Sequence, residues 1–257
     1  MNGTFSGVKI HYEQLGQGDR NVLLLHGWGC SVKHFEPIAQ ELSKDCHVTM
    51  IDFPAHGLSE RPPKPWGVPE FAEMTAELME TLQIAPADII AHSFGARVAI
   101  YLAATRPELV RRLVLTGAAG LKDVPTEAQK KKSAAFQKKK AMLEKLKRVP
   151  FLKTAAENAQ EALRKKYGSA DYNALDAEMR KTFVKIVSQD LSEYLPKIQA
   201  STLLVFGEKD TATPLWMGQR MEKEIPDAGL VVFENDDHFA YLRQWPRFLT
   251  VVKTFLS

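Results

Sequence analysis

At 257 residues, with 45% hydrophobic and 25% charged residues, the chain has the composition of an ordinary globular protein, large enough for one α/β domain or two smaller domains. No apolar run approaches the roughly 20 residues of a membrane helix, and the opening residues MNGTFSGVKIHYEQ lack the apolar core of a secretory signal. We therefore expect a cytoplasmic protein. Cys30 and Cys46 have no metal-ligand spacing, so we predict two reduced thiols, no metal and no cofactor.

The net charge of +3 is unevenly distributed. Residues 121–170 hold 14 lysines and arginines against 5 aspartates and glutamates, a net charge of +9, and the densest part is KKKSAAFQKKK at 130–140. Such lysines often serve solubility alone, but they also predict a weak attraction for an anionic substrate or lipid surface. We expect no nucleic-acid partner, and the oligomeric state stays open.

Apolar, β-branched runs alternate along the chain with helical patterns. In order, the runs typical of strands are VKIHYEQLG, NVLLLHG, HVTMIDF, ADIIAHS, VRRLVLTGAA, STLLVFGE and AGLVVFEN. Helical spacing appears at residues 31–43, 69–83, 95–105, 215–224 and 241–255. Several strands are apolar on both faces, as in a parallel sheet that helices cover on both sides. The alternation therefore predicts βαβ units.

This alternation stops between about residues 121 and 195, where Lys-rich and Ala-rich sequence carries at least two or three helical segments. We predict an α/β core from residues 1–120 and 196–257. Residues 121–195 are then a helical insertion that follows the sixth strand of the sheet.

The stretch IIAHSFGARVAI joins a strand to a helix with no room for an ordinary loop. A serine on so sharp a turn needs small residues two positions before and after it, and Ala91 and Gly95 meet that need. Sites of open α/β sheets form at the carboxyl ends of strands, where Ser93, Asp210 and His238 all lie. We predict Ser93 as nucleophile, His238 as its base and Asp210 as the carboxylate that orients the imidazole.

Two backbone N–H groups are candidates for stabilising an oxyanion. Phe94 follows the serine at the start of a helix, where N–H groups point outward. Trp28 follows His26-Gly27 at the end of an earlier strand and is expected to supply the second donor.

The segments HGWG, DFPAHGLS, AHSFGA, GEKDTATP and DDHF stand in an order that resembles the α/β-hydrolase superfamily over nearly the whole chain. The resemblance implies a mostly parallel, predominantly eight-stranded sheet with helices on both faces. It also implies that residues 121–195 form a lid that shapes the acyl and alcohol pockets. Ala91 and Ala55 replace glycines of the family's motifs, and both replacements are small.

A serine at the elbow excludes the dehalogenases and epoxide hydrolases of this fold, which carry aspartate there. The leading hypothesis is a carboxylesterase-like serine hydrolase that cleaves a small-molecule ester, or a related acyl bond, through an acyl-enzyme. A second hypothesis rests on Ser93-Phe94-Gly95-Ala96-Arg97, which resembles the SxGGR signature of a menaquinone-pathway synthase with carbon–carbon lyase chemistry. A third is a ligand receptor of the same fold with slow turnover.

Residues beside the catalytic loops are the candidates for substrate contacts: Trp28, Phe94, Arg97, Trp216 and Phe239. Arg97 has a structural alternative, in which it reaches solvent or pairs with a carboxylate.

Other polar residues near the strand ends have simpler interpretations. Asp236 and Asp237 are rival acids beside His238, although the position after the seventh strand of the fold favours Asp210. We expect His26 to brace the oxyanion loop and Asp52 to be structural. His92 either lines the pocket or is simply packed.

Overall fold

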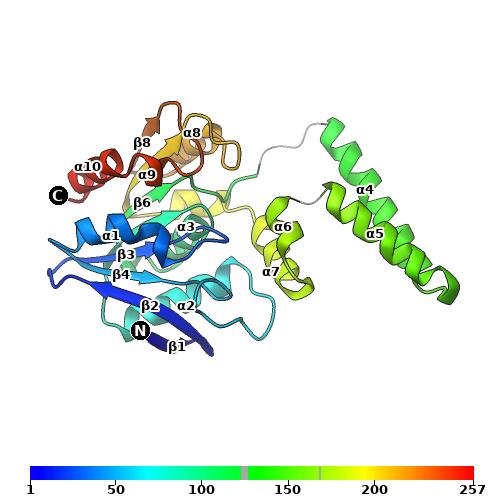
Figure 1. Cartoon of the computed structure of the whole chain (residues 1–257). Coiled ribbons are helices and arrows are strands. Elements are labelled where there is room, and N and C mark those ends of the chain that lie inside the picture. Colours follow the sequence, from blue (N-terminus) through cyan, green and yellow to red (C-terminus); the bar gives the residue numbers. More distant parts are fainter. Residues whose placement is uncertain (123–126, 168) are drawn as a thin grey trace. The chain divides into compact units, whose positions relative to one another are not determined.

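The predicted alternation of strands and helices is present in the computed structural model, which describes residues 1–122, 127–167 and 169–257 (Figure 1). The chain forms two compact units. We call residues 1–121 with 184–257 the core unit, and residues 122–183 the helical unit. No helix within the described ranges is long and apolar enough to cross a membrane.

The core unit is built on an eight-stranded sheet with the order β1-β2-β4-β3-β5-β6-β7-β8. β1 and β2 are antiparallel to their neighbours, and every pairing from β4 to β8 is parallel. The predicted fold class, a mostly parallel eight-stranded sheet with an insertion after the sixth strand, is therefore confirmed. The strands are β1 (Asn2–Phe5), β2 (Val8–Leu15), β3 (Asn21–Leu25), β4 (His47–Ile51), β5 (Ala87–His92), β6 (Val110–Thr116), β7 (Ser201–Gly207) and β8 (Ala228–Phe233).

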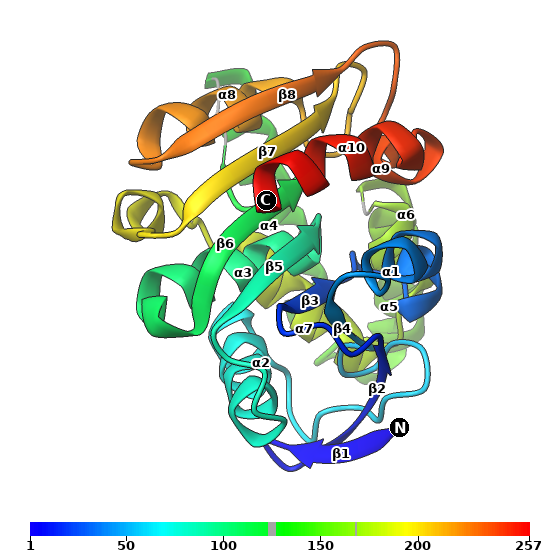
Figure 2. The same ribbon diagram turned by 90° about the vertical axis from the view of Figure 1, so that its left-hand side faces the viewer.

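The central strands are apolar throughout because successive side chains enter two different cores. Leu23 and Leu25 of β3 join the core on one face of the sheet, whereas Val22 and Leu24 join the core on the other face. The first core includes helices α2 (Val68–Thr81), α3 (Phe94–Thr105) and α8 (Leu215–Glu224). The second includes α1 (Glu36–Leu42), α9 (Ala240–Arg243) and α10 (Trp245–Leu256), so helices cover both faces (Figure 2).

Two features of the core unit differ from the sequence-based expectations. The pattern of apolar residues did not mark β1, which is four residues long and buries only Phe5. It pairs with β2 through a two-residue turn, Ser6-Gly7, in which both φ angles are positive. The single helix predicted over 241–255 is broken at Gln244. Pro246 has no N–H and restricts the residue before it, which favours the start of a new helix.

The helical unit contains α4 (Glu127–Leu146), α5 (Lys153–Tyr167), α6 (Ala170–Ala174) and the first part of α7 (Ala177–Ser188). α4 and α5 lie side by side, with the rings of Phe136 and Tyr167 5.5 Å apart. Short 3₁₀ turns occupy Val32–Phe35, Pro107–Leu109, Pro150–Leu152 and Ser192–Lys197.

The insertion returns to the core unit at residue 184, earlier than the predicted 196. Ile186, Leu191 and Leu195 are buried in the first core, which explains this boundary. Leu191 N–H donates to the Gly120 carbonyl at 2.9 Å, so the outgoing and returning chains meet in one backbone hydrogen bond.

Helix α3 crosses β3 so closely that only a glycine fits at the contact. A Cβ atom built on Gly95 would lie 2.3 Å from the Leu25 carbonyl oxygen and 2.8 Å from that of His26. Since both neighbours are backbone atoms, neither can move aside cheaply.

We predict that Gly95→Ala lowers the free energy of unfolding by about 1–3 kcal/mol, because the added methyl group forces β3 and α3 apart. Urea unfolding of the purified variant measures this. Gly229→Ala is the matched control, since nothing lies within 4 Å of a Cβ at that exposed position. Equal stability of the two variants would contradict the close crossing.

Candidate active site

Ser93 lies between the last residue of β5 and the first residue of α3, in a backbone conformation that serine rarely adopts. Its φ is 50° and its ψ is −106°. Such strained backbone costs about 1–3 kcal/mol and persists only where the surrounding structure holds it. Here the buried strand β5 and the buried helix α3 fix the backbone on both sides of Ser93. The hydroxyl therefore lies at the carboxyl edge of the sheet.

His238 follows β8 and faces this hydroxyl. Its Nε2 lies 2.9 Å from Ser93 Oγ, and its Nδ1 lies 2.8 Å from Asp210 Oδ2. Because a carboxylate only accepts, Nδ1 carries the proton and Nε2 is free to accept the serine proton. The imidazole side chain is 18% exposed, whereas the Asp210 side chain is fully buried.

Asp210 is held by three more hydrogen bonds from the turn that follows β7. Its Oδ1 accepts from the N–H groups of Ala212 and Thr213 at 2.8 and 2.9 Å, and its Oδ2 accepts from Thr213 Oγ1 at 2.6 Å. Burial alone would raise the pKa of Asp210, but the hydrogen bonds from His238 and Thr213 outweigh it and keep the pKa below its usual value. The carboxylate is therefore ionised beside the imidazole at neutral pH.

The two rival acids are engaged elsewhere. Asp237 Oδ2 pairs with Arg243 at 2.6 Å, and Asp236 Oδ2 accepts from Gln244 at 2.9 Å. Of the three carboxylates that the sequence offered, the structure brings Asp210 to His238.

The residues predicted to supply the oxyanion donors, Phe94 and Trp28, lie close to the nucleophile. Phe94 is the first residue of α3, and the first N–H groups of a helix have no acceptor within the helix. Trp28 lies in the turn after β3, and its ring packs 5.5 Å from that of Phe94. A Cβ on Gly27 would lie 3.3 Å from Ser93 Cβ, so the turn that carries Trp28 runs directly against the nucleophile.

His26 connects this turn to the loop after β4. Its Nδ1–H donates to the Gly27 carbonyl at 2.7 Å, and its Nε2 accepts from Phe53 N–H at 3.0 Å. Burial is the main cause that lowers the pKa of His26 well below its usual value, so the ring is neutral. In the same loop, Asp52 accepts from the N–H groups of Val32 and Leu58. These contacts are the structural roles that the sequence suggested for both residues.

An aromatic cluster lines the region beside the elbow. The Trp28 ring lies 4.8 Å from that of His56, and the Phe94 ring lies 5.0 Å from the rings of both Phe53 and Phe71. Burial is also the main cause that lowers the pKa of His56, whose Nδ1–H donates to the Pro54 carbonyl at 3.0 Å. Phe53, Phe71 and Phe94 are almost fully buried, so these rings belong to the first core beside the elbow.

The remaining predicted contact residues have different surroundings. Arg97 is buried in α3, and its Nη1 donates to the carbonyls of Ile186 and Gln189 at 3.1 and 3.0 Å. Burial lowers the pKa of Arg97 to about 10, so it stays charged at neutral pH. Trp216 is half-buried against the first core, whereas the Phe239 ring packs 5.5 Å from that of His238.

Three residues of the site escaped the sequence-based predictions. Thr213 binds Asp210 and lies 3.1 Å from His238 Nδ1, and the Asp-x-x-Thr spacing of a side-chain turn could have indicated it. His56 lies inside the DFPAHG motif, and its ring packs against those of Trp28 and Phe94 at 4.8 and 6.4 Å. Gly117 directly follows β6 with φ 49°, and a Cβ there would lie 3.1 Å from His238 Nδ1.

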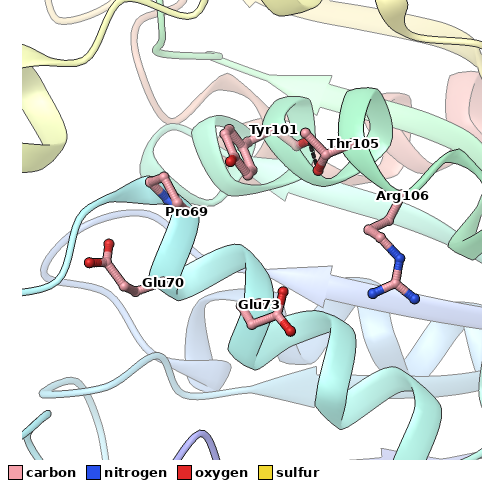
Figure 3. A pocket seen from close by; sticks show the side chains of 6 residues that line it. All are labelled: Pro69, Glu70, Glu73, Tyr101, Thr105 and Arg106. Carbon is pink, nitrogen blue, oxygen red and sulfur yellow. Dashed lines mark hydrogen bonds between the residues drawn. The ribbon is translucent and has the colours of Figure 1, made fainter.

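A shallow groove between α2 and α3 is separate from this site. Its polar groups are used in the fold, since Glu70 accepts from Gly67 N–H at the start of α2 and Arg106 pairs with Glu80 and Glu108. The groove lies along the second half of α3, whereas Ser93 precedes the first turn of that helix. Figure 3 shows the lining side chains, Pro69, Glu70, Glu73, Tyr101, Thr105 and Arg106.

The arrangement at the elbow has the parts that acyl transfer requires. A hydroxyl is hydrogen-bonded to an imidazole, the imidazole is oriented by an ionised and buried carboxylate, and a helix N-terminus adjoins the hydroxyl. Among the described residues, no group of histidine, cysteine, aspartate and glutamate side chains has the arrangement of a metal site.

Comparison with known proteins agrees with this geometry. The family model of the alpha/beta hydrolase fold matches residues 20–243, and the chain belongs to this family. The chain is 30% identical over 253 residues to a pimeloyl-[acyl-carrier protein] methyl ester esterase of Neisseria meningitidis serogroup C, covering 93% of this chain and 94% of that protein. It is 27% identical to a 2-hydroxy-6-oxononadienedioate/2-hydroxy-6-oxononatrienedioate hydrolase of Pseudomonas putida, covering 97% and 92% of the two chains.

Solved structures share the fold. The enol-lactonase of Burkholderia xenovorans LB400 superposes with a TM-score of 0.76 at 22% identity, over 100% of this chain and 99% of that one. Together, the family and its esterase and hydrolase relatives support a hydrolase that acts on an ester or a carbon–carbon bond.

We predict that Asp210→Asn lowers kcat by up to about ten-thousandfold, because an amide in place of the carboxylate favours the wrong tautomer of His238. Steady-state kinetics on a p-nitrophenyl ester measures the loss. Asp237→Asn is the matched control, since Asp237 pairs with Arg243 and should change kcat far less. A mild effect of Asp210→Asn beside a severe effect of Asp237→Asn would mean that the wrong carboxylate had been assigned.

Proposed function

We propose that the protein is a serine hydrolase that cleaves a carboxylic ester, or a related acyl bond, through an acyl-enzyme. The observation that carries the proposal is the Ser93–His238–Asp210 chain, with its two hydrogen bonds of 2.9 and 2.8 Å. The serine attacks the carbonyl carbon while His238 Nε2 takes its proton. Asp210 stabilises the imidazolium that forms.

The second half of the reaction uses the same groups. The imidazolium returns its proton to the leaving alkoxide, which departs as an alcohol and leaves the acyl group on Ser93 Oγ. A water molecule then gives a proton to His238 Nε2 as it attacks the acyl carbon. The imidazolium returns this proton to Ser93 Oγ while the bond between Oγ and the acyl carbon breaks, and the carboxylic acid is released. In both steps the N–H groups of Phe94 and Trp28 are the proposed donors to the oxyanion.

Carbon–carbon bond hydrolysis is the second candidate, because the relative in Pseudomonas putida is named as a hydrolase of a hydroxy-oxo-dioate, a name that contains no ester. If the protein were a synthase of the menaquinone-pathway type, Arg97 would hold an acidic substrate. The position of its Nη1, between the Ile186 and Gln189 carbonyls, favours instead a role in fixing the returning chain of the insertion. A slow-turnover receptor would differ from both enzymes in its turnover number.

We predict that a fluorophosphonate probe labels the wild-type protein at Ser93, and that Ser93→Ala abolishes labelling while the fold is retained. Ester hydrolysis should fall to the residual acceleration from oxyanion donors and binding, about a thousandfold over water. Circular dichroism and thermal unfolding provide the control for folding. Wild-type turnover in a folded Ser93→Ala protein would disprove the serine mechanism. If the wild type is active, p-nitrophenyl esters of increasing chain length measure the size of its acyl pocket.

We further propose that the natural substrate is anionic or is linked to an anionic carrier. The relatives described above are named for an acyl-carrier-protein-linked methyl ester and a dioate. A further relative, 23% identical over 247 residues, is an (E)-2-((N-methylformamido)methylene)succinate hydrolase of Acinetobacter baylyi. Residues 121–170 carry a net charge of +9, and the described lysines at 131, 138, 139 and 140 of α4 are all exposed. A field of this kind acts mainly on the rate of encounter.

We predict that kcat/KM for a p-nitrophenyl ester with a terminal carboxylate falls steeply as salt rises from about 10 mM to several hundred mM, since the screening length shrinks from about 30 Å to a few ångströms. A neutral ester of equal chain length should hardly respond. Replacing Lys131, Lys138, Lys139 and Lys140 with Gln should flatten the curve for the anionic ester without changing kcat.

The matched control replaces four exposed lysines of the core unit with Gln, so that the net charge changes equally: Lys9, Lys44, Lys64 and Lys223. It should leave the salt curve close to that of the wild type. If the salt curves of both esters run parallel in all three proteins, the lysines of α4 do not attract the substrate.

A further inference from the structure

His92 is a buried polar residue that the proposed mechanism does not use. It ends β5, immediately before the nucleophile, and its side chain is 1% exposed. Burial is the main cause that lowers its pKa to about 3, so the ring is neutral at any working pH. A neutral imidazole has one N–H donor and one acceptor nitrogen, and the two nitrogens of His92 face different parts of the site.

The donor is directed at the catalytic histidine. His92 Nε2 lies 3.0 Å from the backbone carbonyl oxygen of His238. Since a carbonyl only accepts, Nε2 carries the hydrogen, and the bond ties the backbone of the base to the residue beside the nucleophile. The two residues are far apart in sequence, so this contact joins the end of β5 to the loop after β8.

The acceptor side faces the oxyanion turn. A Cβ on Gly27 would lie 2.7 Å from His92 Nδ1, which shows how closely the turn that carries Trp28 packs against the ring. His92 Nδ1 and Tyr241 Oη are both buried without a hydrogen-bond partner among the described residues, and their rings are 4.6 Å apart. Aromatic contacts with His238 and Phe239, at 4.7 and 5.2 Å, hold the ring on its remaining sides.

We propose that His92 is a positioning residue: its Nε2–H holds the His238 backbone so that the imidazole keeps its distance to Ser93, and its ring supports the oxyanion turn. The proposal rests on the proposed function. A merely packed ring would need no donor directed at the backbone of the base. Because a displacement of about 1 Å at a reacting group can cost about a hundredfold in rate, one such bond is enough to matter.

The test compares His92→Gln, whose side-chain amide carries an N–H near the position of Nε2, with His92→Leu, which fills similar space without a donor. We expect His92→Leu to lower kcat for a neutral p-nitrophenyl ester by about 10- to 100-fold with little change in KM, and to slow fluorophosphonate labelling in parallel. His92→Gln should recover most of both rates. His92→Met replaces the leucine variant if that protein does not fold.

Thr75→Val is the matched stability control, since it removes another buried hydrogen bond from a side chain to a backbone carbonyl, at Phe71. It should lose stability without losing kcat. Wild-type kcat and labelling in His92→Leu, or equal losses in the leucine and glutamine variants, would overturn the positioning role.

A readout without turnover separates this proposal from the proposed function. The hydrogen on His238 Nδ1, which is hydrogen-bonded to Asp210 Oδ2, is expected to give a downfield proton NMR signal. The signal should persist in His92→Gln and weaken or shift in His92→Leu. If the wild type neither hydrolyses esters nor reacts with the probe, the proposed function fails, whereas the NMR comparison still decides whether His92 positions His238.

Discussion

The site depends on one strained residue, Ser93, whose φ of 50° allows β5 to turn directly into α3. The conformation is unfavourable by itself, so the packing on both sides must hold it. That packing consists of the buried strand β5 and the close crossing of α3 over the β3 backbone at Gly95. The apolar cores on the two faces of the sheet therefore determine where the hydroxyl stands, although no core side chain takes part in the chemistry.

Around this elbow, hydrogen bonds to the backbone fix the loops that carry the other groups. The Thr213 N–H holds the Asp210 carboxylate, His26 joins the turn after β3 to the loop after β4, and His92 joins the elbow to the loop after β8. Burial keeps His26 and His92 neutral, so each has one donor and one acceptor with a fixed direction. Preorganisation of this kind would reduce the reorganisation needed as charge develops in the proposed acyl transfer.

Much of this architecture could be predicted from the sequence because it follows from local patterns. Apolar runs marked β2 to β8, and the small residues around Ser93 marked the elbow. Contacts between distant segments left no such signal: the 3.0 Å approach of His92 to the His238 carbonyl and the engagement of Arg97 by the Ile186 carbonyl appear only in the folded chain. The short strand β1 was missed because four residues with one buried side chain, Phe5, are too few to show a hydrophobic period. The boundary at 184 was missed because residues 184–195 resemble the insertion locally, whereas their burial in the first core is a property of the fold.

The hydrogen bond between Leu191 and Gly120 has a consequence for how such a protein changes over evolutionary time. The outgoing chain at Gly120 and the returning chain at Leu191 are hydrogen-bonded to each other. The segment between them is therefore a long insertion whose two ends are held together by the core unit. Its length adds to the entropy cost of closure only logarithmically, and exchanging it leaves the registers of the sheet undisturbed. Residues 122–183 can therefore be exchanged without disturbing the strand pairings of the core unit, and a protein engineer can graft other segments at the same two points.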